Sequence, residues 1–206
     1  MRAKSLADVQ EVGAATPPEH FPLLDGGLRP RSTDAVVRRI GVLSAVAATA
    51  YGCQPAVARA WVAGEGLDEA LSDTEVAYLL AEAHSPDDEE AARPEAIFAL
   101  AWAVQLIPDA LDFTVEAPNH LVKAVPHPPP DPQGVEAAVT RAHLRSKAEL
   151  IAALDLAFCL HWGVVEATLR GTAWSSRAVP LAIVERRRAL EWLLSSEDWD
   201  EVSLDT

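Results

Sequence analysis

Positively charged side chains are scarce in this chain of 206 residues. Lysine and arginine together number 17 against 31 aspartates and glutamates, which gives a net charge of −14 at pH 7. Nucleic-acid binding depends on neutralising phosphates with lysine and arginine, and anionic membranes attract the same side chains. We therefore expect neither a nucleic-acid nor a membrane partner. If the chain binds a protein, its charge favours a partner with a basic surface.

Cysteine is almost absent as well, because the chain has only Cys53 and Cys159. They lie far apart in predominantly apolar surroundings, so we interpret them as buried free thiols rather than a disulfide. Residues 1–16 lack the apolar central region of a signal peptide. The charge-free run 40–58 approaches membrane-spanning length, but Pro55 and other polar or helix-breaking residues interrupt it and favour a buried helix. These observations predict a cytoplasmic protein.

Motifs that carry chemistry are also missing. The sequence has no glycine-rich phosphate loop, no nucleophile elbow, and no paired cysteines or histidines at metal-ligand spacing. Its six histidines are dispersed along the chain. We therefore predict no catalytic residue, no metal ligand and no cofactor-binding residue, and favour a protein that is not an enzyme.

Helical patterns fill the chain from Ser32 onwards. Apolar residues recur at helical spacing, and no segment shows the alternation of a strand. The sequence predicts an all-α fold, a single orthogonal or irregular bundle of six to eight helices with no significant β-sheet. Residues 31–206 are expected to form this domain, with a proline-rich surface strap at about 108–134. Residues 1–30 contain helix breakers without apolar periodicity, so we expect a flexible N-terminal arm.

Several helix boundaries follow from single residues. Ser72–Glu75 and Ser146–Glu149 each place a serine three residues before a glutamate, which is the pattern of a capping box at a helix start. Pro55 suits the first turn of a helix, whereas Gly52 and Gly171 suit helix ends.

The long helix after the second capping box carries a polar face. Steps of four, three and four residues align Asp155, Cys159, Trp162 and Glu166. His161 lies on the neighbouring apolar stripe. A carboxylate at a buried edge beside a histidine suits general acid–base chemistry. The interpretation that we favour is that Asp155 and His161 are satisfied structural groups on either side of a packed tryptophan.

The final helix, expected from about 180 to 194, has arginines on its apolar side. Arg186 and Arg187 share that side with leucines, so at least one guanidinium points inward. A buried guanidinium needs a carboxylate partner, and its planar fork suits bidentate pairing. The candidate partners are Glu95, Asp155 and an acid of the tail, and Arg93 and Glu185 are candidates to extend the network. An anion-binding pocket and a structural network that ties down the C-terminus are both open, and we favour the second.

Tryptophan is abundant beside only two tyrosines. We interpret most of the indoles as core residues, with an aromatic-lined ligand groove as the alternative. Chain ends normally lose large apolar residues, so Trp199, seven residues from the end and followed by Asp200, predicts a tail that docks on the body. The six tryptophans are Trp61, Trp102, Trp162, Trp174, Trp192 and Trp199.

Five segments occur in an order that resembles the uncharacterised bacterial domain-of-unknown-function family 4272. The segments are Arg93–Ala96 followed by Leu100–Ala103, Leu154–Asp155 through His161–Gly163, Glu185–Arg186 with Ala189–Leu193, Trp199–Asp200, and Asp205–Thr206. The resemblance spans roughly 31–206 and leaves the N-terminal arm outside. It implies a helical fold and brings no established activity, cofactor or partner. The chain departs from the family's pattern at Ala92, at Ala157, Cys159 and Leu160, and at Glu191, which makes a polar pocket at those positions less plausible.

Two hypotheses about function follow. The first is a non-enzymatic protein-interaction module, of a regulatory or immunity type. The alternative is an enzyme or small-ligand sensor with a pocket of arginine, glutamate, aspartate and histidine lined by tryptophans. The residues of this candidate network or pocket are Arg93, Glu95, Trp102, Asp155, His161, Trp162, Glu185, Arg186, Trp192, Trp199 and Asp200. The oligomeric state is left open.

Overall fold

The computed structural model describes residues 1–24, 27–81, 84, 89–129 and 134–206. Within these residues there are eight α-helices and no β-strand, which confirms the predicted all-α fold and number of helices. The helices are α1 (Arg2–Glu11), α2 (Thr33–Ala50), α3 (Pro55–Gly64), α4 (Asp73–Leu80), α5 (Arg93–Ala103), α6 (Val135–Arg141), α7 (Lys147–Leu169) and α8 (Pro180–Leu194). Four 3₁₀ helices accompany them: η1 (Asp68–Ala70), η2 (Glu89–Ala92), η3 (Asn119–Lys123) and η4 (Trp199–Glu201).

The predicted helix boundaries are confirmed. Both capping boxes form, at the starts of α4 and α7. In each, the serine hydroxyl accepts from the backbone N–H of the glutamate, and the glutamate carboxylate accepts from the backbone N–H of the serine. Pro55 occupies the first turn of α3. Gly52 and Gly171 follow the ends of α2 and α7 with φ of +97° and +63°, a left-handed conformation that glycine adopts without strain.

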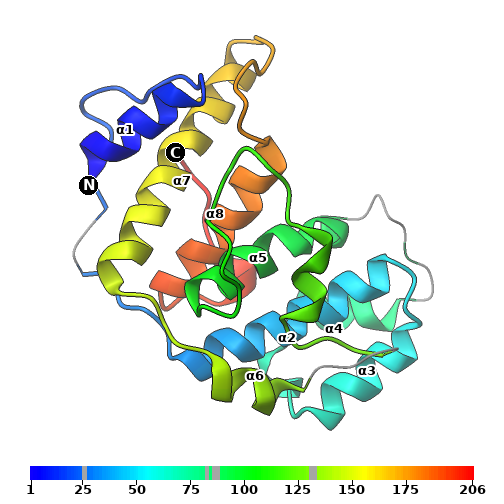
Figure 1. Ribbon diagram of the computed structural model, residues 1–206. Coiled ribbons are helices and arrows are strands. Elements are labelled where there is room, and N and C mark those ends of the chain that lie inside the picture. Colours follow the sequence, from blue (N-terminus) through cyan, green and yellow to red (C-terminus); the bar gives the residue numbers. More distant parts are fainter. Residues whose placement is uncertain (25–26, 82–83, 85–88, 130–133) are drawn as a thin grey trace.

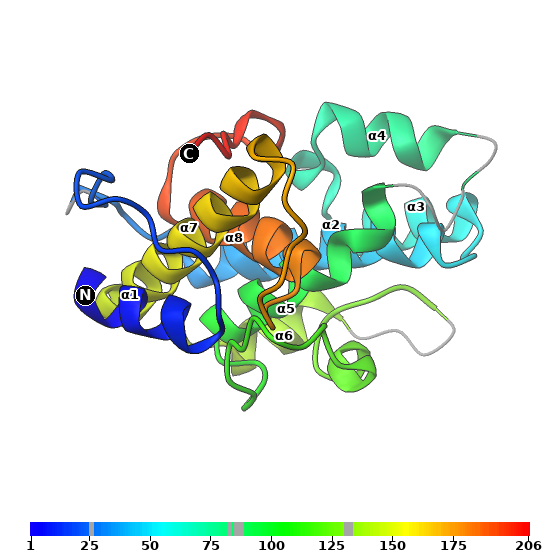
Figure 2. The same ribbon diagram turned by 90° about the horizontal axis from the view of Figure 1, so that it is seen from above.

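Helix α5 lies at the centre of the bundle. It packs against α2 and α8, and α8 packs in turn against α7. Helix α1 lies along α7 at one end of the molecule, while α3 and α4 contact α2 towards the other end (Figures 1 and 2). Nine of the eleven residues of α5 are buried, in keeping with its central position.

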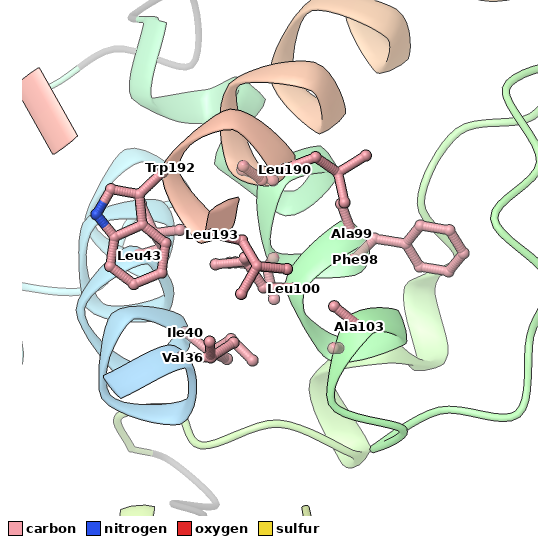
Figure 3. Close-up of a cluster of buried hydrophobic side chains, with 14 of the residues drawn as sticks. Val36, Ile40, Leu43, Phe98, Ala99, Leu100, Ala103, Leu190, Trp192 and Leu193 are labelled. Carbon is pink, nitrogen blue, oxygen red and sulfur yellow. The ribbon is translucent and has the colours of Figure 1, made fainter. Parts of the chain in front are cut away.

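The main apolar core lies where α2, α5 and α8 meet (Figure 3). Ile40 and Leu43 of α2, Leu100 of α5 and Leu193 of α8 are all fully buried. The indole of Trp192 lies beside α2 in the same cluster. Burial of this kind is the dominant favourable contribution to folding, so these three helices form the frame on which polar side chains are placed.

Within the predicted N-terminal arm, residues 2–11 form a helix, α1. This helix buries only Ser5 and Val9, which explains why its sequence shows no apolar stripe. Arg2 holds it to α7 through an ion pair with Asp155, in which the nitrogen and oxygen lie 2.8 Å apart. Phe21 stacks on Phe158 of α7, with ring centroids 4.4 Å apart, so the segment after α1 is also docked. Contacts distant in sequence therefore order the described part of residues 1–30.

The proline-rich segment packs more closely than a surface strap. Pro126 and Pro128 are buried, whereas Pro129 is exposed. Residues 119–123 form η3, so the region 108–134 is not wholly irregular. Pro130, which was predicted to belong to the strap, lies outside the described residues.

One helix of the described chain, α7, is long and apolar enough to cross a membrane by length and composition alone. In the fold it packs against α1 and α8. A core helix of a soluble protein passes the same test, and the buried residues of α7 are consistent with that role.

Candidate functional site

Arg186 joins α8 to α5 and to the loop after α5. Its side chain is fully buried, and its Nε donates to Glu95 Oε2 over 2.8 Å. Its guanidinium also donates to the backbone carbonyls of Asp112 and Val115. The second oxygen of Glu95 accepts from the backbone N–H of Ala117 over 2.7 Å. Both oxygens of Glu95 therefore accept hydrogen bonds from the protein. The pair of Arg186 and Glu95 holds α8, α5 and the loop after α5 together.

A second ion pair joins the start of α5 to α8. Arg93 donates to Glu185 over 3.1 Å, and the other oxygen of Glu185 lies 3.4 Å from Arg188. The guanidinium of Arg93 also lies over the ring of Trp199, 6.0 Å from its centroid. The network predicted around Arg93 and Glu185 therefore exists, and it is connected to the docked tail.

Arg187 holds the C-terminal tail. It donates to the backbone carbonyls of Leu204 and Asp205 over 2.9 and 2.8 Å, and to Nδ1 of His161. Burial, reinforced by the charge of Arg187, lowers the pKa of His161 to about 4 from its ordinary 6.5. The imidazole is therefore neutral near pH 7 and acts as an acceptor.

Asp155 does not lie in the same cluster as His161. It is fully buried and binds α1, accepting from Arg2 and from the hydroxyl of Ser5 over 2.6 Å. The acid–base arrangement of these two residues is not present, nor does Asp155 partner Arg186. Cys159, one helical turn away, is buried and free, and burial raises its pKa to about 11, so it is an unreactive thiol. Cys53 is also free, but only half-buried.

The tryptophans do not line one shared cavity. Trp192 and Trp199 form an edge-to-face pair with ring centroids 6.0 Å apart, near the tail. Trp102 lies under the guanidinium of Arg145, 4.6 Å from the ring centroid, and Trp162 lies edge-on to Phe21. The predicted docking of the tail through Trp199 is confirmed, because that side chain is buried.

Sequence reasoning missed a buried ion pair between Arg39 of α2 and Glu75 of α4. Their closest atoms lie 2.9 Å apart, and the guanidinium of Arg39 lies 5.1 Å from the ring centroid of Trp199. The signal was present, because Arg39 falls three residues after Val36 and four before Leu43 on an apolar helix face. Asp200 of the tail also contacts α4, because its carboxylate accepts from the hydroxyl of Thr74 over 2.7 Å.

Two hollows in the described surface are large enough to bind a partner. The first, which we call the apolar cavity, has a volume of about 440 Å³ and lies between the second half of α2, α5 and η3. The second, which we call the acidic groove, has a volume of about 620 Å³ and lies between the first half of α2, the segment 66–73 and the tail. Of the predicted network, Glu95 lines the first, and Trp192, Trp199 and Asp200 line the second.

A metal site is not evident in the part of the chain that the structure describes, where no group of three or more histidine, cysteine, aspartate or glutamate side chains is placed to hold a metal ion. What the fold and the site define is an all-α protein in which buried arginines interlock helices and tail. The chain belongs to the family described as "Domain of unknown function (DUF4272)", whose model matches residues 1–202. This match confirms the resemblance and extends it to α1, which the sequence comparison had left outside. No curated protein and no solved structure matches the chain.

Proposed function

We propose that the protein is a cytoplasmic, non-enzymatic interaction module whose acidic groove binds a basic segment of a partner protein. The observation that carries this proposal is the charge around the groove, where six exposed carboxylates accompany three guanidiniums. The carboxylates are those of Asp34, Glu69, Asp73, Asp198, Asp200 and Glu201.

The three arginines of the groove are already engaged. Arg39 is paired with Glu75, which lies behind the groove, and Arg38 is paired with Asp34 over 2.9 Å. Arg31 donates to the backbone carbonyls of Trp192 and Glu197. Because a carboxylate from outside the groove compensates one of these charges, the groove presents net negative charge to a partner.

The walls of the groove are held in place before any partner arrives. Arg31, just before α2, donates to the carbonyl of Glu197, and Arg39 of α2 lies over the ring of Trp199. Asp200 of the tail accepts from both the hydroxyl and the backbone N–H of Thr74 in α4. A preformed surface loses less conformational entropy on binding, which supports a role in recognition.

The alternative of an enzyme or sensor built on the predicted network has less support. Arg93, Glu95, Asp155, Arg186 and Arg187 each have protein partners, which leaves their charges compensated within the fold. Groups that satisfy one another hold the fold in one arrangement and are not free for substrate chemistry.

The test compares two triple charge-reversal variants that have the same net charge as each other. Asp73→Lys, Asp198→Lys and Glu201→Lys together reverse the groove, while Glu11→Lys, Glu19→Lys and Glu89→Lys reverse exposed acids elsewhere. We expect the affinity for a fluorescently labelled oligo-arginine peptide, measured by anisotropy, to fall about ten-fold or more in the groove variant and much less in the control. Equal losses in both variants would show that the peptide senses only total charge.

A second experiment addresses the native partner. A photo-crosslinking amino acid at Glu69 should capture a reproducible basic protein in the native cell, and the same group at Glu11 should not. Absence of any reproducible product at Glu69 would contradict the proposal.

A further inference from the structure

We propose that the apolar cavity is a binding site for an uncharged, mainly apolar small molecule that carries one hydrogen-bonding oxygen. This site is separate from the acidic groove, since it involves the second half of α2 rather than the first. The proposal does not depend on a protein partner.

The size and lining of the cavity suit such a ligand. Its volume of about 440 Å³ falls within the ~300–1,000 Å³ of typical small-molecule sites. Most of its wall is aliphatic, formed by Ala47, Ala48, Ile97, Leu121 and Val125. An apolar molecule that enters it removes this surface from water, which favours binding.

One polar group of the wall lacks a partner. Ser44 is only 5% exposed, and its hydroxyl has no hydrogen-bond partner within the described structure. Most buried polar groups are paired, and each exception needs an explanation. A ligand oxygen that reached this hydroxyl would satisfy it, so Ser44 supplies a point of specificity in a mainly apolar wall.

The charges around the cavity select against ions. Two carboxylates line the cavity. Glu95 is buried, and its oxygens are occupied by Arg186 and the N–H of Ala117, whereas Glu116 is exposed and therefore solvated. No lysine or arginine is among the described lining residues, so an anion would find no counter-charge there. A cation would compete with Arg186, which is already bound to Glu95. An uncharged ligand is therefore favoured.

The rim provides an apolar entrance. Tyr51, Val122 and Leu181 line the cavity and are 65%, 46% and 48% exposed. Large apolar side chains exposed together commonly mark a binding site. The hydroxyl of Tyr51 donates to the carbonyl of Ala91 over 2.9 Å, which holds the ring at the rim.

The experiment compares 2-phenylethanol with ethylbenzene, which have similar apolar bodies and differ in one hydroxyl. Titration of each into the ¹⁵N-labelled full chain should perturb the backbone amides of Ser44, Ala48 and Ile97. We expect 2-phenylethanol to bind about five-fold more tightly, as one neutral hydrogen bond implies. Absence of saturable shifts at these amides with either compound would overturn the proposal.

Variants then distinguish binding in the apolar cavity from binding elsewhere on the protein surface. Ala48→Phe fills the cavity and should weaken binding about ten-fold or more, whereas Ala60→Phe, on the exposed face of α3, should leave it unchanged. Ser44→Ala should keep binding of ethylbenzene and remove the preference for the alcohol. Equal affinities for Ala48→Phe and Ala60→Phe would overturn the location, and an unchanged preference in Ser44→Ala would overturn the role of Ser44.

Discussion

At the scale of single residues, the fold depends on charges that have been taken out of water. Arg186 has no exposed surface, yet it keeps a carboxylate and two carbonyls as partners. Burial lowers the pKa of Arg186, and Glu95 opposes that shift by stabilising the charged form. Such a pair contributes little net stability but makes either partner costly to remove alone, because the other remains buried and charged.

Arg186→Met should therefore lower the free energy of unfolding by about 3–5 kcal/mol, measured by urea denaturation. The control is Arg170→Met, which removes an arginine that is 71% exposed and paired with Glu166 at the end of α7. Exposed pairs contribute about 0–1 kcal/mol, so the control should be nearly neutral. Similar losses in the two variants would contradict the buried role of Arg186.

The hydroxyl groups of Ser44 and Thr49 provide a second comparison, on one helix. Ser44→Ala removes a buried hydroxyl without a partner in the described structure, so we expect the free energy of unfolding to rise by about 1 kcal/mol. Thr49→Val removes a hydroxyl that donates to the carbonyl of Ala45 over 3.0 Å, and should lower it by a similar amount. Urea denaturation of both variants measures the difference, and a loss of stability in Ser44→Ala would show that its hydroxyl is paired.

At the scale of elements, α1 shows how a weakly patterned segment is recruited to the bundle. Its mean hydropathy is low, and it depends on Arg2 and Ser5 meeting Asp155 at a distance of about 150 residues in sequence. Isolated helices of ten residues are unstable in water, so the helix exists because tertiary contacts hold it.

Arg2→Ala should release α1, because it leaves the fully buried Asp155 with the hydroxyl of Ser5 as its remaining donor. We expect faster amide hydrogen exchange throughout 2–11 while exchange in α5 and α8 stays slow. Lys4→Ala, which breaks an exposed pair with Asp8 on the same helix, is the matched control and should leave exchange unchanged. Uniform acceleration across the molecule would mean that α1 is not a separate unit.

The elements also show what the sequence could predict. Helix boundaries were accessible because Ser72, Ser146, Gly52 and Gly171 act within one turn of the chain. The sequence could not predict that Glu95, rather than another acid, pairs with Arg186, because this pairing depends on how α5 and α8 cross. The sequence also could not predict that the hydroxyl of Ser44 lacks a partner in the described structure, because it does not show which carbonyls the fold places near this residue.

At the scale of the whole molecule, the C-terminal segment contributes to one of the two proposed binding sites, the acidic groove. Its Trp199 packs under Arg39 and Arg93, and its last carbonyls bind Arg187. The groove is therefore built partly from the tail, whereas no described residue of the tail lines the apolar cavity. Loss of the tail would be expected to open the groove before it affected the cavity.

The pH dependence of unfolding tests this connection through His161. Its pKa is about 4 in the folded protein and near the ordinary 6.5 when unfolded, so the unfolded chain binds more protons between these values. The stability from the neutral imidazole is present above pH 6.5 and is lost as pH falls towards 4, by at most about 3 kcal/mol. His161→Gln keeps a neutral acceptor for Arg187, and urea denaturation from pH 7 to pH 4 should show a smaller loss of stability than in the wild type. Arg187, which contacts His161, and the acids Glu191 and Asp205 that face Arg187 are common to both proteins, so the comparison isolates the imidazole. Identical pH profiles for the two proteins would show that His161 is not held neutral, and that the contact between Arg187 and the tail forms without it.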